Sequence, residues 1–274
     1  MGISTIQLII ITTCTAIFEV LENIHLKPPN LNDLKIIADQ FEKSWNFPNC
    51  VGAIDGKHIE IRNPAKSGSL YYNYKQYFSI IPQALVDGRG RFMVIAVGSY
   101  GSESDGGVYS NSLLSKMIEN GDIDIPPPKI LPNSNIILPH VFVADDAYPL
   151  KYYIMKPYKG KLSHIQENFN YRLSRARRMV ECTFGILASK WRILNRALDT
   201  NITNSELIIK TCALLHNLVI DKENVDLRPK NTQDPKQNNY LWNNQSIKNP
   251  SKVSKDIRDA FSEYFYSNKL SWQL

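Results

Sequence analysis

Three stretches of the sequence carry acidic residues in settings where carboxylates could do chemistry. Residues 51–61 have the pattern of a buried strand that carries Asp55. An apolar run further along the chain ends on Asp145 and Asp146, and a later helical pattern carries Glu181. Carboxylate oxygens are the ligands that Mg²⁺ prefers, and a pair of such ions can activate water for phosphodiester cleavage. Two strands and a helix that bring these acids to one point would make a metal site.

Each acid also has a purely structural interpretation. Asp55 precedes a glycine and could be a turn residue. The two neighbouring acids further along could cap or end a strand. Glu181 could form an ion pair with Arg177 or Arg178, which lie about one helical turn before it. The residues taken singly therefore leave a metal site and a set of ordinary turn and surface positions both open.

The composition favours oxygen ligands and an anionic partner. The chain has 274 residues, 43% of them hydrophobic, which is enough for one large domain or two small ones. It carries 32 Lys and Arg against 26 Asp and Glu, and its isoelectric point is about 9.0. This charge favours a polyanion such as DNA. The four cysteines form no CxxC pair and the five histidines no HxxxH pair, so the sequence encodes neither a zinc module nor a disulfide framework.

The chain begins with an uncharged run, residues 3–18, that could be mistaken for a signal or membrane segment. The run lacks a basic stretch before it and is shorter than the roughly 20 residues that a bilayer span needs. Apolar residues recur at spacings of three and four over residues 4–24. We therefore expect an amphipathic helix buried against the rest of the protein, and no membrane partner.

Periodicity and turn signals predict an α/β layered architecture. The predicted strands are residues 51–61, 77–86, 92–97 and 141–144, the first three forming an antiparallel meander. The predicted helices are residues 4–24, 32–45, 111–119, 166–191, 204–220 and 253–266. Residues 98–107 and 123–139 read as loops. The expected organisation is a helical region over residues 1–46, a core over 47–223, a polar linker over 224–251 and an amphipathic helix within 252–274.

Five motifs, taken in order, resemble the PIF/Harbinger transposases and the nucleases domesticated from them. These motifs are GAIDGKHI, VDGRGRF, ADDAYPL, RRMVECTFGILASKWRIL and ALLHNL. The resemblance covers roughly residues 4–223. It implies an RNase H-like DDE core, in which Asp55, Asp145 and Glu181 hold two Mg²⁺ or Mn²⁺ ions for metal-dependent cleavage of DNA, with strand transfer as a further reaction of the same site. The separations between the three acids, 90 and 36 residues, leave room for the predicted strands, including a short one near residues 153–156.

The sequence departs from the family pattern around the second acid. Family members commonly show Gly-Asp-Ser where this chain has Ala144, Asp145 and Asp146, so either acid is a candidate ligand. The following AYPL motif places Asp145 at the family's acidic position. Asp105, in the predicted loop 98–107, matches a further acid that recurs in the family.

The start of the chain resembles only the final part of the family's helical region, which contains a helix-turn-helix, so the sequence looks truncated there. In the family, DNA targeting is often shared with a Myb-like protein, which implies such a partner and a nuclear location. The rival hypothesis is a decayed or domesticated scaffold that keeps the fold and binds DNA or a partner without catalysis.

Basic residues surround the predicted acids. Lys57 and His58 lie beside Asp55 and could contact substrate, although a histidine on a strand is more often packed in the protein. His216 lies in an apolar helix and is expected to be structural. Seven basic residues around Glu181 could neutralise phosphates or form a solvated helix face: Arg172, Arg175, Arg177, Arg178, Lys190, Arg192 and Arg196.

Overall fold

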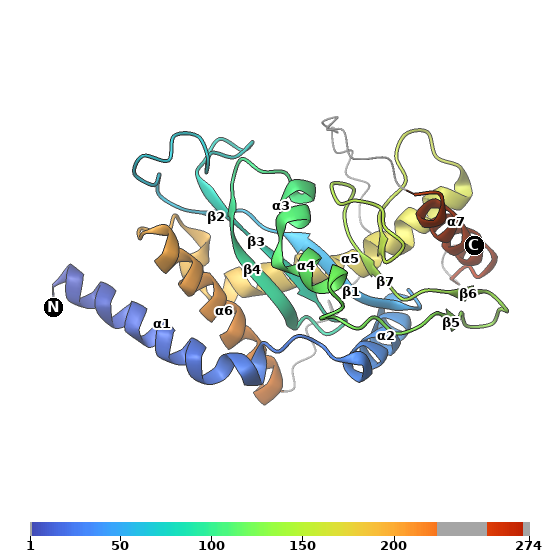
Figure 1. Cartoon of the computed structure of the whole chain (residues 1–274), viewed down its shortest axis with the longest axis horizontal. Helices are drawn as coiled ribbons and strands as arrows, with labels where there is room; N and C mark the ends of the chain where they lie inside the picture. The colour runs from blue at the N-terminus through green and yellow to red at the C-terminus, as the bar shows by residue number, and fades with distance from the viewer. Residues whose placement is uncertain (1, 224–250, 271–274) are drawn as a thin grey trace.

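A six-stranded mixed sheet forms the centre of the computed structural model, which describes residues 2–223 and 251–270. The long helix α5 runs behind this sheet, and the short helices α3 and α4 lie in front of it (Figure 1). The strands are β1 (Cys50–Gly56), β2 (Ile59–Glu60), β3 (Ser79–Val86), β4 (Phe92–Tyr100), β7 (Val141–Val143) and β8 (Ile154–Met155). The helices are α1 (Ile3–His25), α2 (Leu31–Trp45), α3 (Asp105–Asn111), α4 (Leu113–Glu119), α5 (His164–Lys190), η1 (Arg192–Asn195), α6 (Ile202–Glu223) and α7 (Lys252–Ser267).

The sheet combines an antiparallel meander with a parallel extension. β3 pairs antiparallel with β1 and β2 along one edge and with β4 along the other. β1 then pairs parallel with β7, and β7 pairs parallel with β8. The predicted meander and the predicted fourth strand are confirmed. The fold class is the expected one, a mixed sheet flanked by helices.

The sequence determines where α5 begins and which face it buries. Ser163 and Gln166 form a capping box at its start, with each side chain accepting a hydrogen bond from the other residue's backbone N–H. The predicted apolar stripe is buried, including Phe169, Val180 and Phe184. This helix crosses the sheet behind β1, β3 and β7 and therefore presents its side chains to the strand ends (Figure 1).

An aromatic cluster attaches the last described helix, α7, to α5. Phe261 and Phe265 of α7 pack with Phe47 and Phe169, and the ring centroids of Phe47 and Phe265 lie 4.9 Å apart. All four rings are fully buried. Most of the predicted linker, residues 224–250, lies outside the described residues.

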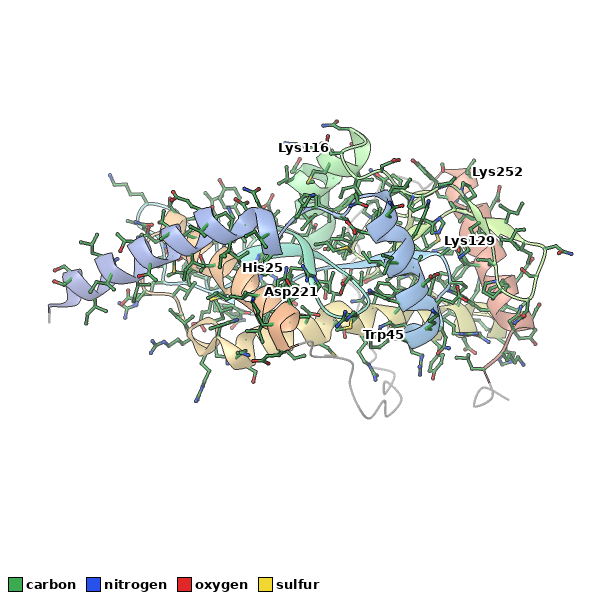
Figure 2. The ribbon with its side chains drawn as sticks, turned by 90° about the horizontal axis from the view of Figure 1, so that it is seen from below. His25, Trp45, Lys116, Lys129, Asp221 and Lys252 are labelled. Carbon is green, nitrogen blue, oxygen red and sulfur yellow. The ribbon has the colours of Figure 1, made fainter. Side chains whose placement is uncertain are left out.

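The expectation that the first helix is buried is wrong. α1 has 23 residues, and by length and composition alone it is apolar enough to cross a bilayer. One side of α1 packs against α6, and its end is fastened to the body: His25 Nδ1 lies 2.6 Å from Asp221 Oδ2 (Figure 2), and Arg91 pairs with the same carboxylate. Its first turns project away from the other elements (Figure 1), and Leu8 is 64% exposed. Burial is lost because α6, which α1 packs against, covers one side of α1 only.

Two predicted loops contain regular structure. β4 continues to Tyr100, and α3 begins at Asp105, so most of residues 98–107 is not loop. The predicted helix 111–119 is divided at Ser112, because the Ser112 hydroxyl accepts a hydrogen bond from Ser115 N and starts α4 as a separate helix. Residues 123–139 contain a small hairpin of β5 (Lys129–Ile130) and β6 (Ile137–Leu138).

Candidate active site

The parallel register of β1 and β7 places two of the predicted acids beside each other. Ala53 lies opposite Val143, and each is followed two residues later by an acid, Asp55 and Asp145. Side chains two residues apart on a strand point to the same face. Asp55 near the end of β1 and Asp145 just beyond the end of β7 therefore lie at the same edge of the sheet.

Arg177 of α5 brings the third acid into this arrangement. Its guanidinium Nη2 lies 3.0 Å from Glu181 Oε1, one helical turn later, and 4.0 Å from Asp55 Oδ2. Burial acts to lower the pKa of Arg177, but the carboxylates of Asp55, Glu181 and Asp145 together raise it. The structure thus gathers all three predicted acids around one arginine. Of the two ion pairs that the sequence allows for Glu181, the structure contains the one with Arg177.

The adjacent acids Asp145 and Asp146 face different partners. Asp145 Oδ1 accepts a hydrogen bond of 2.9 Å from Ala147 N. Burial raises the pKa of Asp145, and the charge of Arg177 opposes that rise. Asp146 Oδ2 instead lies 2.5 Å from Lys159 Nζ. Of the two, Asp145 is the acid that interacts with Arg177.

Two lysines that sequence reasoning missed hold the turn after β7. Besides the Lys159 ion pair, Lys156 Nζ donates to the carbonyl oxygens of Asp146 and Tyr148, at 2.8 and 2.7 Å. Burial lowers the pKa of Lys156 to about 8. The available signal was a run of lysines after the short strand near residues 153–156. The spacing of these lysines alone does not show that they fold back onto the turn after β7.

Close backbone packing places the start of α3 beside the same turn. A Cβ atom added to Gly106 would lie 2.3 Å from the carbonyl oxygen of Ala147, so only glycine allows this approach. Asp105, the further acid singled out in the sequence, is the first residue of α3 and precedes this contact directly. The backbone of Asp105 therefore lies next to the turn that carries Asp145.

The donor types present fit a divalent cation. Carboxylate oxygens are the preferred ligands of Mg²⁺, and Asp55 and Asp145 lie side by side at partly buried strand ends. The side chain of Glu181 is 52% exposed and forms an ion pair with Arg177. Within the described residues, no three Asp, Glu, His or Cys side chains already converge closely enough to enclose an ion. In the structure Glu181 is instead engaged by Arg177.

Two of the seven basic residues around Glu181 do not belong to a phosphate-binding face. Arg172 is only 3% exposed and donates to the carbonyl oxygens of Asn46 and Asn268, at 2.8 and 2.7 Å. Arg177 is turned inward to the acids. The prediction is wrong for these two because α5 is covered by the sheet on one side and by α7 on another.

The histidines near the acids are structural. His58 Nδ1 lies 2.8 Å from Ser79 Oγ, and its ring packs against Tyr74. His216 Nε2 lies 2.9 Å from the carbonyl oxygen of Gly90, as expected for a buried helix position. Burial lowers the pKa of Lys57, with Asp55 opposing that change, so Lys57 remains the basic side chain directly beside Asp55.

The half-buried His58 makes stability dependent on pH. Burial lowers its pKa from the ordinary 6.5 to about 4. Since the unfolded chain takes up this proton and the folded chain does not, stability falls as pH decreases from about 6.5 to about 4. After allowance for solvent screening, we expect the parent to lose about 1–2 kcal/mol more than His58→Gln over this range. Denaturant unfolding at several pH values measures the difference, and His164→Gln, with a side chain 93% exposed, is the matched control.

Comparison with known families identifies the chain. A family model described as DDE superfamily endonuclease matches residues 54–217, from the strand of Asp55 into the ALLHNL motif. This region is more than half of the chain and includes all three acids. The chain belongs to the DDE superfamily endonucleases. The predicted resemblance to the harbinger-derived members of this superfamily is confirmed by the relatives.

Three relatives illustrate the match. The Arabidopsis thaliana protein named ALP1-like is 32% identical over 240 residues, which are 86% of this chain and 58% of the relative. The Arabidopsis thaliana protein named Antagonist of Like Heterochromatin Protein 1 is 30% identical over 72% of this chain and 50% of its own length. The Homo sapiens protein named "Putative nuclease HARBI1" is 25% identical over 71% of this chain and 52% of its own length. The chain spans about half the length of these curated relatives. No solved structure matches it.

Proposed function

We propose that this DDE superfamily endonuclease is a metal-dependent nuclease that cleaves phosphodiester bonds of DNA. Asp55, Asp145 and Glu181 are the proposed ligands and catalytic residues. The observation that carries the proposal is their arrangement around Arg177, two on adjacent parallel strand ends and one on the helix that crosses them. The excess of basic residues over the whole chain fits an anionic substrate.

The proposed ions are Mg²⁺ or Mn²⁺. When bound, a pair of such ions activates a water molecule and stabilises the leaving 3′ oxygen. The residues of the chain supply the positions for this chemistry. Asp55 and Asp145 are held by the sheet, whereas Lys156 and Lys159 hold the turn that follows β7. Strand transfer by the same site, a Myb-like partner and a nuclear location extend the proposal by resemblance alone.

Incubation of the full chain with supercoiled DNA tests the proposal. We expect nicking with Mg²⁺ or Mn²⁺ and none with a chelator. Asp55→Asn should reduce the rate by about a hundredfold or more, because several kcal/mol of transition-state stabilisation are lost. Asp199→Asn is a matched control, since Asp199 forms an exposed surface pair with Arg62. Thermal unfolding of each variant shows that it is folded.

The rival function, a binding scaffold without catalysis, predicts a different pair of results. A folded chain that binds DNA, shows no nicking and gains no stability from Mn²⁺ would contradict the nuclease proposal. Metal binding by a working site should instead raise the melting temperature progressively with Mn²⁺ concentration, because the bound ion stabilises the folded state by RT ln(1 + [L]/Kd).

A further inference from the structure

Arg177 occupies the position at the centre of the acid cluster. Its side chain is only 17% exposed and extends from α5 toward the ends of β1 and β7. It contacts Glu181 at 3.0 Å and Asp55 at 4.0 Å, and it interacts electrostatically with Asp145. A guanidinium in this place is directed at the protein's own carboxylates.

The charges explain why an arginine is needed there. The three carboxylates around Arg177 carry like charge and two of them are partly buried, so the cluster is unfavourable without a nearby cation. One guanidinium can donate to several carboxylates at once through its planar fork. Arg177 therefore stabilises the folded site when no cation is present. Its own Nε atom is buried without a hydrogen-bond partner, a cost that the contacts to the acids offset.

The same contacts oppose metal binding. A divalent cation and the guanidinium would compete for the oxygen atoms of Asp55 and Glu181, and both carry positive charge. Asp55 is fixed by the sheet and Asp145 by the turn after β7, while Glu181 is half-exposed on a helix and has the longest side chain of the three. Of the three acids, Glu181 can leave Arg177 with the least change in the surrounding structure.

We propose that Arg177 is an internal counterion of the active site: it balances the acids in the metal-free protein, and a cation is bound only when Glu181 exchanges Arg177 for the metal. This inference rests on the proposed function and adds a control on its metal affinity. Arg177 is a positioning residue in this proposal, because it acts through the carboxylates.

The affinity for Mn²⁺ tests the proposal directly. The measured quantity is free Mn²⁺ by its electron paramagnetic resonance signal, in a titration of the full-length parent, Arg177→Gln and Arg178→Gln. We expect Arg177→Gln to bind Mn²⁺ about tenfold more tightly or better, since a positive charge close to the ligands is removed. In a chelator, Arg177→Gln should also melt at a lower temperature than the parent. Addition of Mn²⁺ should raise the melting temperature of Arg177→Gln by more than it raises that of the parent. Arg178→Gln, its neighbour on α5, should leave the affinity within about twofold of the parent value.

The outcomes separate this inference from the proposed function. Mn²⁺ binding by the parent that Asp55→Asn removes, but that Arg177→Gln fails to strengthen, overturns the counterion role and leaves the metal site intact. Absence of binding in both the parent and Arg177→Gln overturns both proposals. If Arg177→Gln does not fold in a chelator, Arg177→Lys is measured instead. Its single ammonium cannot reach Asp55 and Glu181 together, so tighter binding than the parent supports the proposal and unchanged binding overturns it.

Discussion

Asp145→Asn should abolish metal-dependent cleavage, whereas Asp146→Asn should leave it largely intact. Asp145 shares the Arg177 site with Asp55, and losing a ligand there should reduce the rate by about a hundredfold or more. Asp146 pairs with Lys159 instead, and its side chain is only 11% exposed. Its loss should lower the free energy of unfolding by about 1–3 kcal/mol without removing a residue from the Arg177 site. Initial nicking rates at saturating Mn²⁺ measure the contrast.

Each of these two variants is the control for the other, because they make the same change at adjacent positions. A large loss in Asp146→Asn with normal activity in Asp145→Asn would reverse the ligand assignment. Equal losses in both would indicate that the turn after β7, and not one carboxylate, is what cleavage requires. Melting temperatures in a chelator show whether either variant has lost its fold.

Arg172→Met should cause a large loss of stability far from the acids. Arg172 donates hydrogen bonds to the backbone carbonyl oxygens of Asn46, which directly follows α2, and Asn268, which directly follows α7. Its guanidinium lies 4.9 Å from the ring centroid of Phe265. It therefore joins three helices through one buried side chain. Methionine fills a similar volume but leaves both carbonyl oxygens without their donor. We expect the free energy of unfolding to fall by about 2–4 kcal/mol.

Arg175→Met is the matched control for this change. Arg175 lies on the same helix, is less buried and stacks on Tyr171. Its replacement should cost less than about 1 kcal/mol, as most partly exposed substitutions do. Urea denaturation measures the free energy of unfolding of both variants, which can be compared directly when their dependence on urea concentration has the same slope. A loss in Arg172→Met no greater than that in Arg175→Met would contradict the proposed role of Arg172 in joining the helices.

The burial of Arg172 also shows a limit of reading charge from sequence. In the sequence, Arg172 and Arg177 belong to a basic cluster around Glu181 and resemble phosphate-binding residues. In the structure both are removed from solvent, one by α7 and the other by the strand ends that carry the acids. Burial lowers the pKa of Arg172 to about 10. A helical pattern predicts which face is apolar, but it cannot show that an arginine on the border of that face is covered by a distant segment.

Local sequence determined the order of the elements, the meander of β1, β3 and β4, and the apolar stripe of α5, because these follow from periodicity, turns and caps within short windows. The motifs determined the family and named the three acids. Only the tertiary structure decided that the acids meet, because Asp55 and Asp145 come together through a parallel register between strands that are 90 residues apart in the chain. It also decided that Arg177 lies between the acids and that α1 is largely uncovered. Both depend on which elements pack against each helix, and that packing is a property of the whole fold.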